Sequence, residues 1–480
     1  MNIVLTGRIL GALLIYLAVA LLVPLPFSWV YADGAATALV LSILVSGVCG
    51  GLLYRFCRSE RDLSVRDGFA VVTFGWTFFA LFGSLPFVFS GAIPSFLDAF
   101  FETMSGFTTT GSTILTNIEA IPESLLLWRS MTQWLGGMGI IVLSLAILPM
   151  LGVGGMQLFK AEVPGPTADR LKPRIQDTAK LLWGVYVLLT SAEIILLMLG
   201  NMSFFDALNH AFTTMATGGF STRNASVAAY DSAFIDWVIT VFMFLAGINF
   251  SLHYLALRGR VLDYVRNEEF RFYVTLTLFG IVLITLFNMG SSYDSILDSL
   301  RFSAFQVVSI LTTTGFGTAD YELWPVLCQY LLVIGMFVGG CAGSTGGGMK
   351  VARILLLFKH AHVQVYRLIH PRAVRLVKLA DRPVDKEVMQ SILGFFALYM
   401  GVFVAASLIM AGTGMDLTSA GAAVIATLGN IGPGLGSVGP TDNFADVPAI
   451  GKIVLTLCML LGRLELFTVL VLVFPTFWRK

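Results

Sequence analysis

A short unit recurs four times along this chain, and it constrains the fold more than any other feature. Each copy has a short apolar segment, too short to cross a bilayer, followed by a glycine-containing loop. Long apolar segments flank every copy. We call the loops loop 1 (108–113), loop 2 (216–220), loop 3 (312–317) and loop 4 (429–434). Recurrence of one unit within a chain indicates internal repeats that pack against one another.

Long apolar segments make up most of the remaining sequence. Hydrophobic residues account for 56% of the 480 residues and charged residues for 12%, which is typical of a polytopic membrane protein. About ten segments reach the ~20 residues that cross a bilayer as a helix. They lie near 9–30, 35–56, 68–90, 126–151, 178–200, 233–257, 271–290, 323–340, 388–411 and 449–474. The first is too long for a signal peptide, so we expect it to be retained.

Together these features predict an all-α polytopic membrane protein. Two leading transmembrane helices (1–66) precede four repeats, each made of a helix, a pore helix, a filter loop and a second helix. The predicted repeats are 67–160, 161–260, 261–386 and 387–480, arranged around a pseudo-fourfold pore.

The distribution of charge predicts the orientation. Segments 91–127 and 412–451, which contain loops 1 and 4, have acids but no Lys or Arg, whereas basic residues crowd the stretch from Lys350 to Lys386. The positive-inside rule therefore places all four loops on the outer side and both termini in the cytoplasm. The basic stretch suits lipid headgroups or a docking site for a cytosolic regulator.

The chemistry of the loops suits a cation. Glycine permits a positive φ, so successive carbonyls can point the same way, and rings of carbonyls can replace the hydration shell of potassium. Threonine hydroxyls add oxygens, and the C-terminal ends of the short helices favour positive charge. Close helix packing is the alternative role for the glycines, but four matching loops on one side favour a filter. The candidate potassium-binding residues are Thr109, Thr110, Gly111, Thr217, Gly218, Thr314, Gly315, Asn430, Ile431 and Gly432.

The four loops differ in sequence, which limits how uniform a filter can be. Only loop 3 has the order Gly-Phe-Gly. We therefore expect one main ring of carbonyls near Gly111, Gly218, Gly315 and Gly432, with weaker discrimination of potassium against sodium than in a channel of four identical loops.

A glycine-rich segment, Gly339–Lys350, interrupts the helix that follows loop 3. Each glycine costs ~1 kcal/mol relative to Ala in a helix, so the segment should not be helical. It could be a mobile intramembrane loop that blocks the pore or a plain cytoplasmic turn, and composition supports both equally. The residues concerned are Gly339, Gly340, Gly343, Ser344, Thr345, Gly346, Gly347, Gly348 and Lys350.

A few polar residues fall within apolar segments. Arg463 must face a cavity or a partner from another helix, because a charge in the bilayer is costly. An interhelical hydrogen bond is the simplest interpretation for Glu193 and Gln133. We assign no role to His210 or His253.

Several function classes find no support in the sequence. A net charge of +1 provides no excess of positive charge for binding nucleic acid. The five cysteines are scattered along the chain, which suggests free thiols. No nucleophile–base pair, metal cluster or phosphate-binding loop points to an enzyme, and no cofactor or nucleotide is expected to bind this chain directly.

The four loops, the two leading helices, the glycine-rich segment and Arg463 resemble those of the Trk/Ktr/HKT potassium transporters, most closely the bacterial TrkH/TrkG branch. The resemblance covers essentially the whole chain. It implies potassium as substrate, the bacterial inner (plasma) membrane, and a homodimer with one pore per protomer. It also implies that Gly339–Lys350 is a gating loop, that Arg463 faces the pore, and that a ring of TrkA-like nucleotide-binding subunits regulates transport.

A secondary transporter of another small ion or solute, coupled to sodium or protons, is the alternative. Broken helices occur there too, usually in inverted pairs. Four repeats in the same orientation favour a channel-like pore, while passive and coupled transport stay equally open.

Overall fold

The computed structural model describes residues 2–57, 64–146, 175–380 and 382–478. The regular secondary structure of these residues is helical except for a two-stranded antiparallel hairpin, β1 (Lys378–Leu379) and β2 (Arg382–Pro383). The boundary predicted between the first two repeats, at 160, lies outside the described residues.

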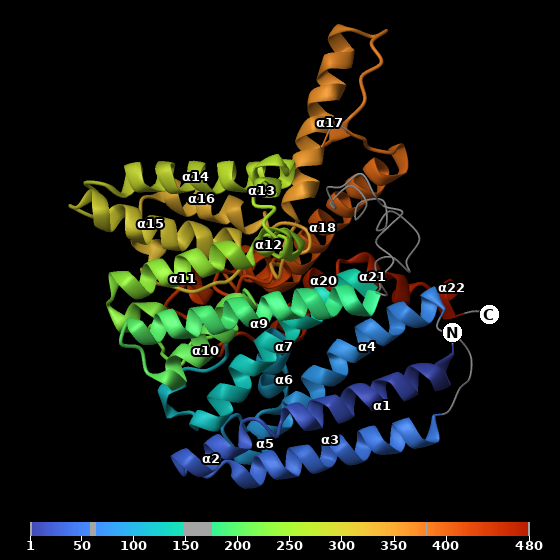
Figure 1. Cartoon of the computed structure of the whole chain (residues 1–480), viewed down its shortest axis with the longest axis vertical. Helices are drawn as coiled ribbons and strands as arrows, with labels where there is room; N and C mark the ends of the chain where they lie inside the picture. The colour runs from blue at the N-terminus through green and yellow to red at the C-terminus, as the bar shows by residue number, and fades with distance from the viewer. Residues whose placement is uncertain (1, 58–63, 147–174, 381, 479–480) are drawn as a thin grey trace.

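Two leading helices lie along one edge of the molecule (Figure 1). The first comprises α1 (Ile3–Ala20) and α2 (Leu25–Tyr31), and the second is α3 (Ala36–Phe56). α1 and α3 are in close contact at Gly11 and Gly50. A side chain on either glycine would collide with the backbone of the other helix. Small residues allow this close approach, as is common between membrane helices.

The rest of the chain repeats one order of elements: a long helix, a short helix, a 3₁₀ turn and a second helix. Repeat 1 contains α4 (Val65–Gly83), α5 (Leu85–Ser90), α6 (Phe96–Phe107), η1 (Ile118–Ala120) and α7 (Glu123–Ala146). Repeat 2 contains α9 (Ile175–Leu199), α10 (Phe204–Met215), η3 (Ser226–Tyr230), α11 (Ala233–Ala246), α12 (Phe250–Leu257) and α13 (Leu262–Arg266). Repeat 3 contains α14 (Glu268–Asn288), α15 (Ile296–Leu311), η4 (Tyr321–Leu323), α16 (Val326–Met336) and α17 (Val351–Ile369). Repeat 4 contains α18 (Lys386–Gly412), α19 (Leu417–Leu428), η5 (Gly436–Val438), α20 (Ala449–Arg463), α21 (Phe467–Leu470), η6 (Val471–Val473) and α22 (Pro475–Trp478).

The short helices α6, α10, α15 and α19 share a start signal. Ser precedes Asp by three residues in the first three, and the order is reversed in the fourth: Ser95/Asp98, Ser203/Asp206, Ser295/Asp298 and Asp416/Ser419. In α6, α10 and α19 the N-cap side chain accepts hydrogen bonds from first-turn N–H groups. These caps fix where α6, α10 and α19 begin.

Packing between repeats follows a cyclic order. The second helix of each repeat contacts the short helix of the next: α7 on α10, α11 on α15, α16 on α19, and α20 on α6. The last contact joins repeat 4 to repeat 1 and closes the circle. The four short helices therefore lie inside a ring of longer ones.

Three second helices are broken. As predicted, the glycine-rich segment separates α16 from α17. The expected continuous helices at 233–257 and 449–474 are wrong, because α11 and α12 meet at 101° and α20 and α21 at 113°. Within the described residues, six helices are long and apolar enough to cross a membrane, or eight if each bent pair counts as one. The other two predicted spans are 126–151 and 323–340. α7 covers the first up to Ala146, and 147–151 lie outside the described residues, whereas α16 has only 11 residues.

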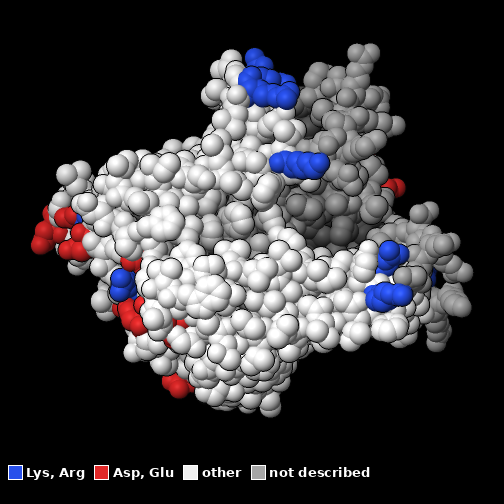
Figure 2. All heavy atoms as spheres, turned by 60° about the horizontal axis from the view of Figure 1, so that its bottom comes forward, with Lys and Arg blue, Asp and Glu red and all other residues white. Residues whose placement is uncertain are grey.

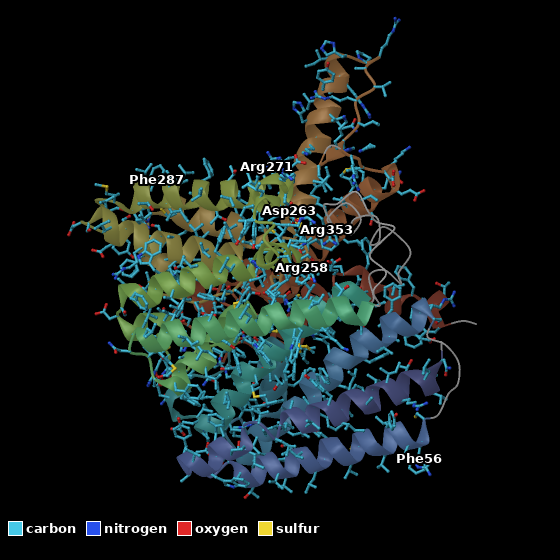
Figure 3. All side chains as sticks on the ribbon, viewed as in Figure 1. Phe56, Arg258, Asp263, Arg271, Phe287 and Arg353 are labelled. Carbon is cyan, nitrogen blue, oxygen red and sulfur yellow. The ribbon has the colours of Figure 1, made fainter. Side chains whose placement is uncertain are left out.

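Charge is segregated along the helices. Figure 2 shows most of the visible Asp and Glu at the left of the view, where one basic patch lies among them, and most of the visible Lys and Arg at the right and towards the top. α17 projects from the helical body (Figure 1). Arg258, Asp263, Arg271 and Arg353 gather around its base, whereas Phe287 lies towards the far end of α14 (Figure 3).

Candidate ion-binding site

The four loops share one backbone geometry. After each short helix, two left-handed residues occur two positions apart: Thr109 and Gly111 (φ 51° and 88°), Thr217 and Gly219 (54° and 74°), Thr313 and Gly315 (60° and 82°), and Asn430 and Gly432 (54° and 104°). The residue between them donates its N–H to a carbonyl five positions back, at 2.8 Å in every loop. These donors are Thr110, Gly218, Thr314 and Ile431. The alternation of left-handed residues lets neighbouring carbonyls face the same way.

This geometry corrects the register of loop 2 by one residue. The glycine equivalent to Gly111, Gly315 and Gly432 is Gly219, not Gly218. Gly218 instead matches Thr110, Thr314 and Ile431. The sequence alone does not decide this register, because loop 2 has two consecutive glycines, Gly218 and Gly219, and either could adopt the positive φ.

The left-handed glycines bring the loops into mutual contact. A side chain on Gly111 would collide with the Gly218 carbonyl, and one on Gly219 with the Thr314 carbonyl. A side chain on Gly315 would meet the Ile431 carbonyl, and one on Gly432 the Thr110 carbonyl. Each loop therefore presents its glycine to a carbonyl of the next loop, in the order 1, 2, 3, 4 and back to 1. Any other residue at these positions would be both strained and obstructed.

A second circle of contacts surrounds the loops on the side where the short helices begin. Repeat 1 contacts repeat 2 where the backbone N–H of Ile118 donates to Asn224 Oδ1 (2.8 Å). Repeat 2 joins repeat 3 through Ala228 N–H and Gly317 O (3.1 Å). Repeat 3 joins repeat 4 through Tyr321 Oη and Gly434 O (2.7 Å), and repeat 4 joins repeat 1 through Phe444 N–H and Thr113 O (2.8 Å).

Glu322 strengthens the junction between repeats 3 and 4. Its carboxylate accepts the N–H of Gly436 at 2.5 Å. Burial raises the pKa of Glu322 above the ordinary range of a glutamate.

Threonine hydroxyls brace loops 1 and 3 in the same way. Thr108 and Thr110 join their hydroxyls at 2.7 Å, and Thr312 and Thr314 join theirs at 2.8 Å. In loop 4, Asn430 Nδ2 donates to the Thr110 hydroxyl at 2.9 Å and so links repeats 4 and 1. These hydroxyls therefore bond within the protein.

The glycine-rich segment lies against the loops, on the side where the short helices end. Thr345 donates to Met215 O at the end of α10 (3.0 Å) and to Ala246 O at the end of α11 (3.2 Å). Gly347 donates to the Thr313 hydroxyl of loop 3 (2.6 Å). A side chain on Gly347 would approach Gly429 O of loop 4 to 2.5 Å. One segment thus touches three of the four repeats, directly adjacent to their loops.

Arg463 completes this contact. It is 2% exposed, and it donates to Thr345 O at 2.6 Å and to Gly136 O of α7 at 3.2 Å. Its Nε has no partner within the described residues. Glu465 pairs instead with Arg353 of α17, at 2.6 Å. Arg463 therefore connects repeats 4 and 1 to the glycine-rich segment, which belongs to repeat 3.

One acid binds the segment near its start and also binds the helix that follows it. Glu269, in the first turn of α14, accepts Ala342 N–H at 2.7 Å and Ala352 N–H at 3.2 Å. Within the segment, Lys350 Nζ donates to Gly346 O.

Comparison with known proteins gives matches over nearly the whole chain. The TrkH family, described as cation transport proteins, matches residues 36–480. The Trk system potassium uptake protein TrkH of Salmonella typhimurium is 46% identical over 98% of this chain and 99% of its own length. The chain belongs to the TrkH family.

Other relatives agree with this assignment. Trk system potassium uptake protein TrkG of Escherichia coli is 36% identical over 90% of this chain and 89% of its own. The crystal structure of the potassium transporter TrkH from Vibrio parahaemolyticus superposes with a TM-score of 0.92 at 41% identity, covering both chains completely. This TrkH-family chain is therefore a multi-pass membrane protein of a transporter family and not an enzyme, and it shares that fold.

Two polar residues of α7 have partners that the sequence did not indicate. Arg129 pairs with Glu102 of α6 at 2.7 Å, donates to Ser221 O at 3.0 Å, and lies 3.5 Å above the centre of the Phe220 ring. Gln133 hydrogen-bonds to loop 2 itself. Spacing gave a partial signal, because Arg129 and Gln133 lie four residues apart and so share one face of the helix.

The other unassigned polar residues serve local structure, with one exception. His210 bonds to Asp206 O and the Ser221 hydroxyl, and His253 to the Tyr264 hydroxyl and Leu245 O. Glu193 of α9 is fully buried beside the Thr214 hydroxyl of α10, so its side chain faces another helix, although neither carboxyl oxygen makes a hydrogen bond of good geometry within the described residues.

Proposed function

We propose that this protein translocates potassium through a pore whose selective element is the ring formed by loops 1 to 4. The cyclic contact between the glycine of each loop and a carbonyl of the next carries the proposal. Only loops that surround one axis close such a circle. The relatives named as potassium uptake proteins support potassium as the ion.

The ring supplies the chemistry that a desolvated cation needs. Backbone carbonyls replace part of the hydration shell, and the C-terminal ends of α6, α10, α15 and α19 add negative partial charge from one side. Acids at the other end of the short helices raise the local cation concentration. The filter residues are those predicted from sequence, with Gly219 added in loop 2.

The glycine-rich segment is the gate in this proposal. Its contacts with loops 3 and 4 and with the end of α10 support a closed path beneath the ring. Arg463 holds the segment there and adds a positive charge that repels cations.

The surrounding assembly follows from the same proposal. The Trk system named for the relatives has further components, and the projecting α17 with the basic stretch to Lys386 is the surface suited to a cytosolic nucleotide-binding ring of the TrkA type. The protein acts as a homodimer in the bacterial inner membrane, with loops outward and both termini cytoplasmic.

Gly315→Ser tests the ring. A side chain there collides with the Ile431 carbonyl, so we expect potassium-dependent growth of a transport-deficient cell to fail at low potassium. Loss of discrimination against sodium should be about tenfold or more, equivalent to ~1.4 kcal/mol. Gly317→Ser is the matched control, because Gly317 is in the same loop and a Cβ there would meet no atom closer than 3.9 Å. Equal rescue by both variants, at equal membrane levels, would overturn the filter assignment.

A further inference from the structure

The backbone conformation of Gly218 does not require a glycine. Its φ is not in the left-handed region, unlike that of Thr217 and Gly219 on either side. The equivalent positions in the other loops hold Thr110, Thr314 and Ile431. What excludes a side chain at Gly218 is the amide group of Gln133, whose three terminal atoms occupy the space that a Cβ would need.

Gln133 binds loop 2 with both ends of its amide. Nε2 donates to Gly218 O at 2.6 Å, and Oε1 accepts the N–H of Phe220 at 3.1 Å. The side chain is fully buried, so neither bond competes with water. Gly218 O is also the carbonyl that faces Gly111 in the ring. Gln133 therefore acts on an atom of the filter.

Loop 2 lacks the internal brace found in loops 1 and 3. The paired hydroxyls of Thr108 with Thr110 and of Thr312 with Thr314 have no counterpart, because loop 2 has Ala216 and Gly218 at these positions. α7 of repeat 1 supplies the missing polar group from outside the loop. Arg129, one turn earlier on α7, adds a bond to Ser221 O just beyond the loop.

We propose that Gln133 is a positioning residue for ion selectivity, which orients the Gly218 carbonyl within the ring in place of a side chain that loop 2 does not have. This inference rests on the proposed filter. It assigns a selectivity role to a helix outside the four loops.

A double-mutant cycle tests the proposal. Gln133→Ala, Gly218→Ala and the double variant are purified, reconstituted in liposomes and measured for potassium uptake and its inhibition by sodium. We expect Gln133→Ala to lower potassium-over-sodium discrimination about five- to tenfold. Gly218→Ala should be worse, because its methyl group collides with Gln133. The double variant should discriminate better than Gly218→Ala alone, since truncating Gln133 removes the colliding atoms.

Two further variants separate positioning from general stability. Gln133→Met retains the volume but neither hydrogen bond, so it should fold and still lose discrimination, and it decides the question if Gln133→Ala does not fold. Gln306→Ala is the matched control, because Gln306 is equally buried but donates to Ala319 O, beyond the ring. It should keep wild-type discrimination.

Unchanged discrimination in folded Gln133→Met, or independent effects of Gln133→Ala and Gly218→Ala, would overturn the inference. Gly315→Ser distinguishes this failure from failure of the filter itself. If Gly315→Ser loses discrimination while the Gln133 variants do not, only the role of Gln133 is wrong. If neither loses it, the filter assignment falls too.

Discussion

At the scale of single residues, four glycines meet two independent demands. Gly111, Gly219, Gly315 and Gly432 each adopt a positive φ, and each lies against a carbonyl of the neighbouring loop. Strain alone would tolerate Asn, as at position 430, but the contact leaves no room for any Cβ. The sequence predicted three of these four glycines, and missed Gly219 only because Gly218 precedes it.

Gln133 shows what a linear pattern cannot reveal at this scale. The proposed role of Gln133 depends on its hydrogen bond to Gly218, which is 85 residues away in sequence and in another repeat. A buried glutamine in an apolar helix indicates some hydrogen bond, but not its partner.

Arg463→Ala should raise potassium uptake. The substitution removes the hydrogen bonds to Thr345 O and Gly136 O, which connect Arg463 to the glycine-rich segment and to α7. It also removes the positive charge that the proposal places in the ion path. We expect an increase of several-fold in the initial rate of uptake into proteoliposomes. Arg258→Ala, a change at an exposed arginine on the same side of the molecule (Figure 3), should leave the rate unchanged. A rate equal to or below wild type in well-folded Arg463→Ala would count against the proposed pore-facing role.

At the scale of elements, the broken second helices of repeats 2 to 4 meet beneath the loops. Cys341 N–H of the glycine-rich segment donates to Gly247 O at the bend after α11 (2.8 Å), and Phe250 N–H at the start of α12 donates to Gly343 O (3.1 Å). Arg463, at the end of α20, reaches the same segment. Mutual hydrogen bonding satisfies the backbone groups that the breaks release, which membrane-embedded chain requires.

Only one of these three breaks was predictable. Gly339–Lys350 has enough glycine to exclude a helix by composition alone. The bend near Gly247 has a single glycine, and the bend near Glu465 depends on a left-handed glutamate (φ 55°), which sequence does not indicate. Tertiary hydrogen bonds decide both positions.

Glu269→Ala should weaken the closed arrangement of the glycine-rich segment. The substitution removes Oε1, which accepts the N–H groups of Ala342, near the start of the segment, and Ala352, just past its end, and a buried donor without its acceptor is costly. We therefore expect a higher basal potassium flux without added regulatory partner, by about two- to fivefold. Glu268→Ala is the control, since Glu268 pairs with Lys359 and Ala380 N–H away from the segment. If both variants had the same basal flux, Glu269 would not be the fastening.

At the scale of the whole molecule, the arrangement is a closed circle of four unequal repeats. The fold class, the two leading helices and the order of elements within each repeat could be predicted, because hydrophobic segments and glycine loops are local signals. The cyclic order could not, since it depends on contacts such as α20 on α6 and Asn430 on Thr110, which join distant parts of the chain. Loops 2 and 4 lack the threonine pairs of loops 1 and 3 and form hydrogen bonds with repeat 1 instead. Gln133 of repeat 1 binds loop 2, and Asn430 of loop 4 binds Thr110 of loop 1.

The central claim is that four loops from one chain form a single cation site. Anomalous diffraction from crystals grown with rubidium or thallium, which substitute for potassium, tests it most directly. The account predicts the strongest peak on the axis of the ring, coordinated by carbonyls of all four loops, with Thr110, Gly218, Thr314 and Ile431 among them. In Gly315→Ser crystals that peak should weaken or vanish. A strongest peak away from the ring, or one coordinated by fewer than three loops, would contradict the account.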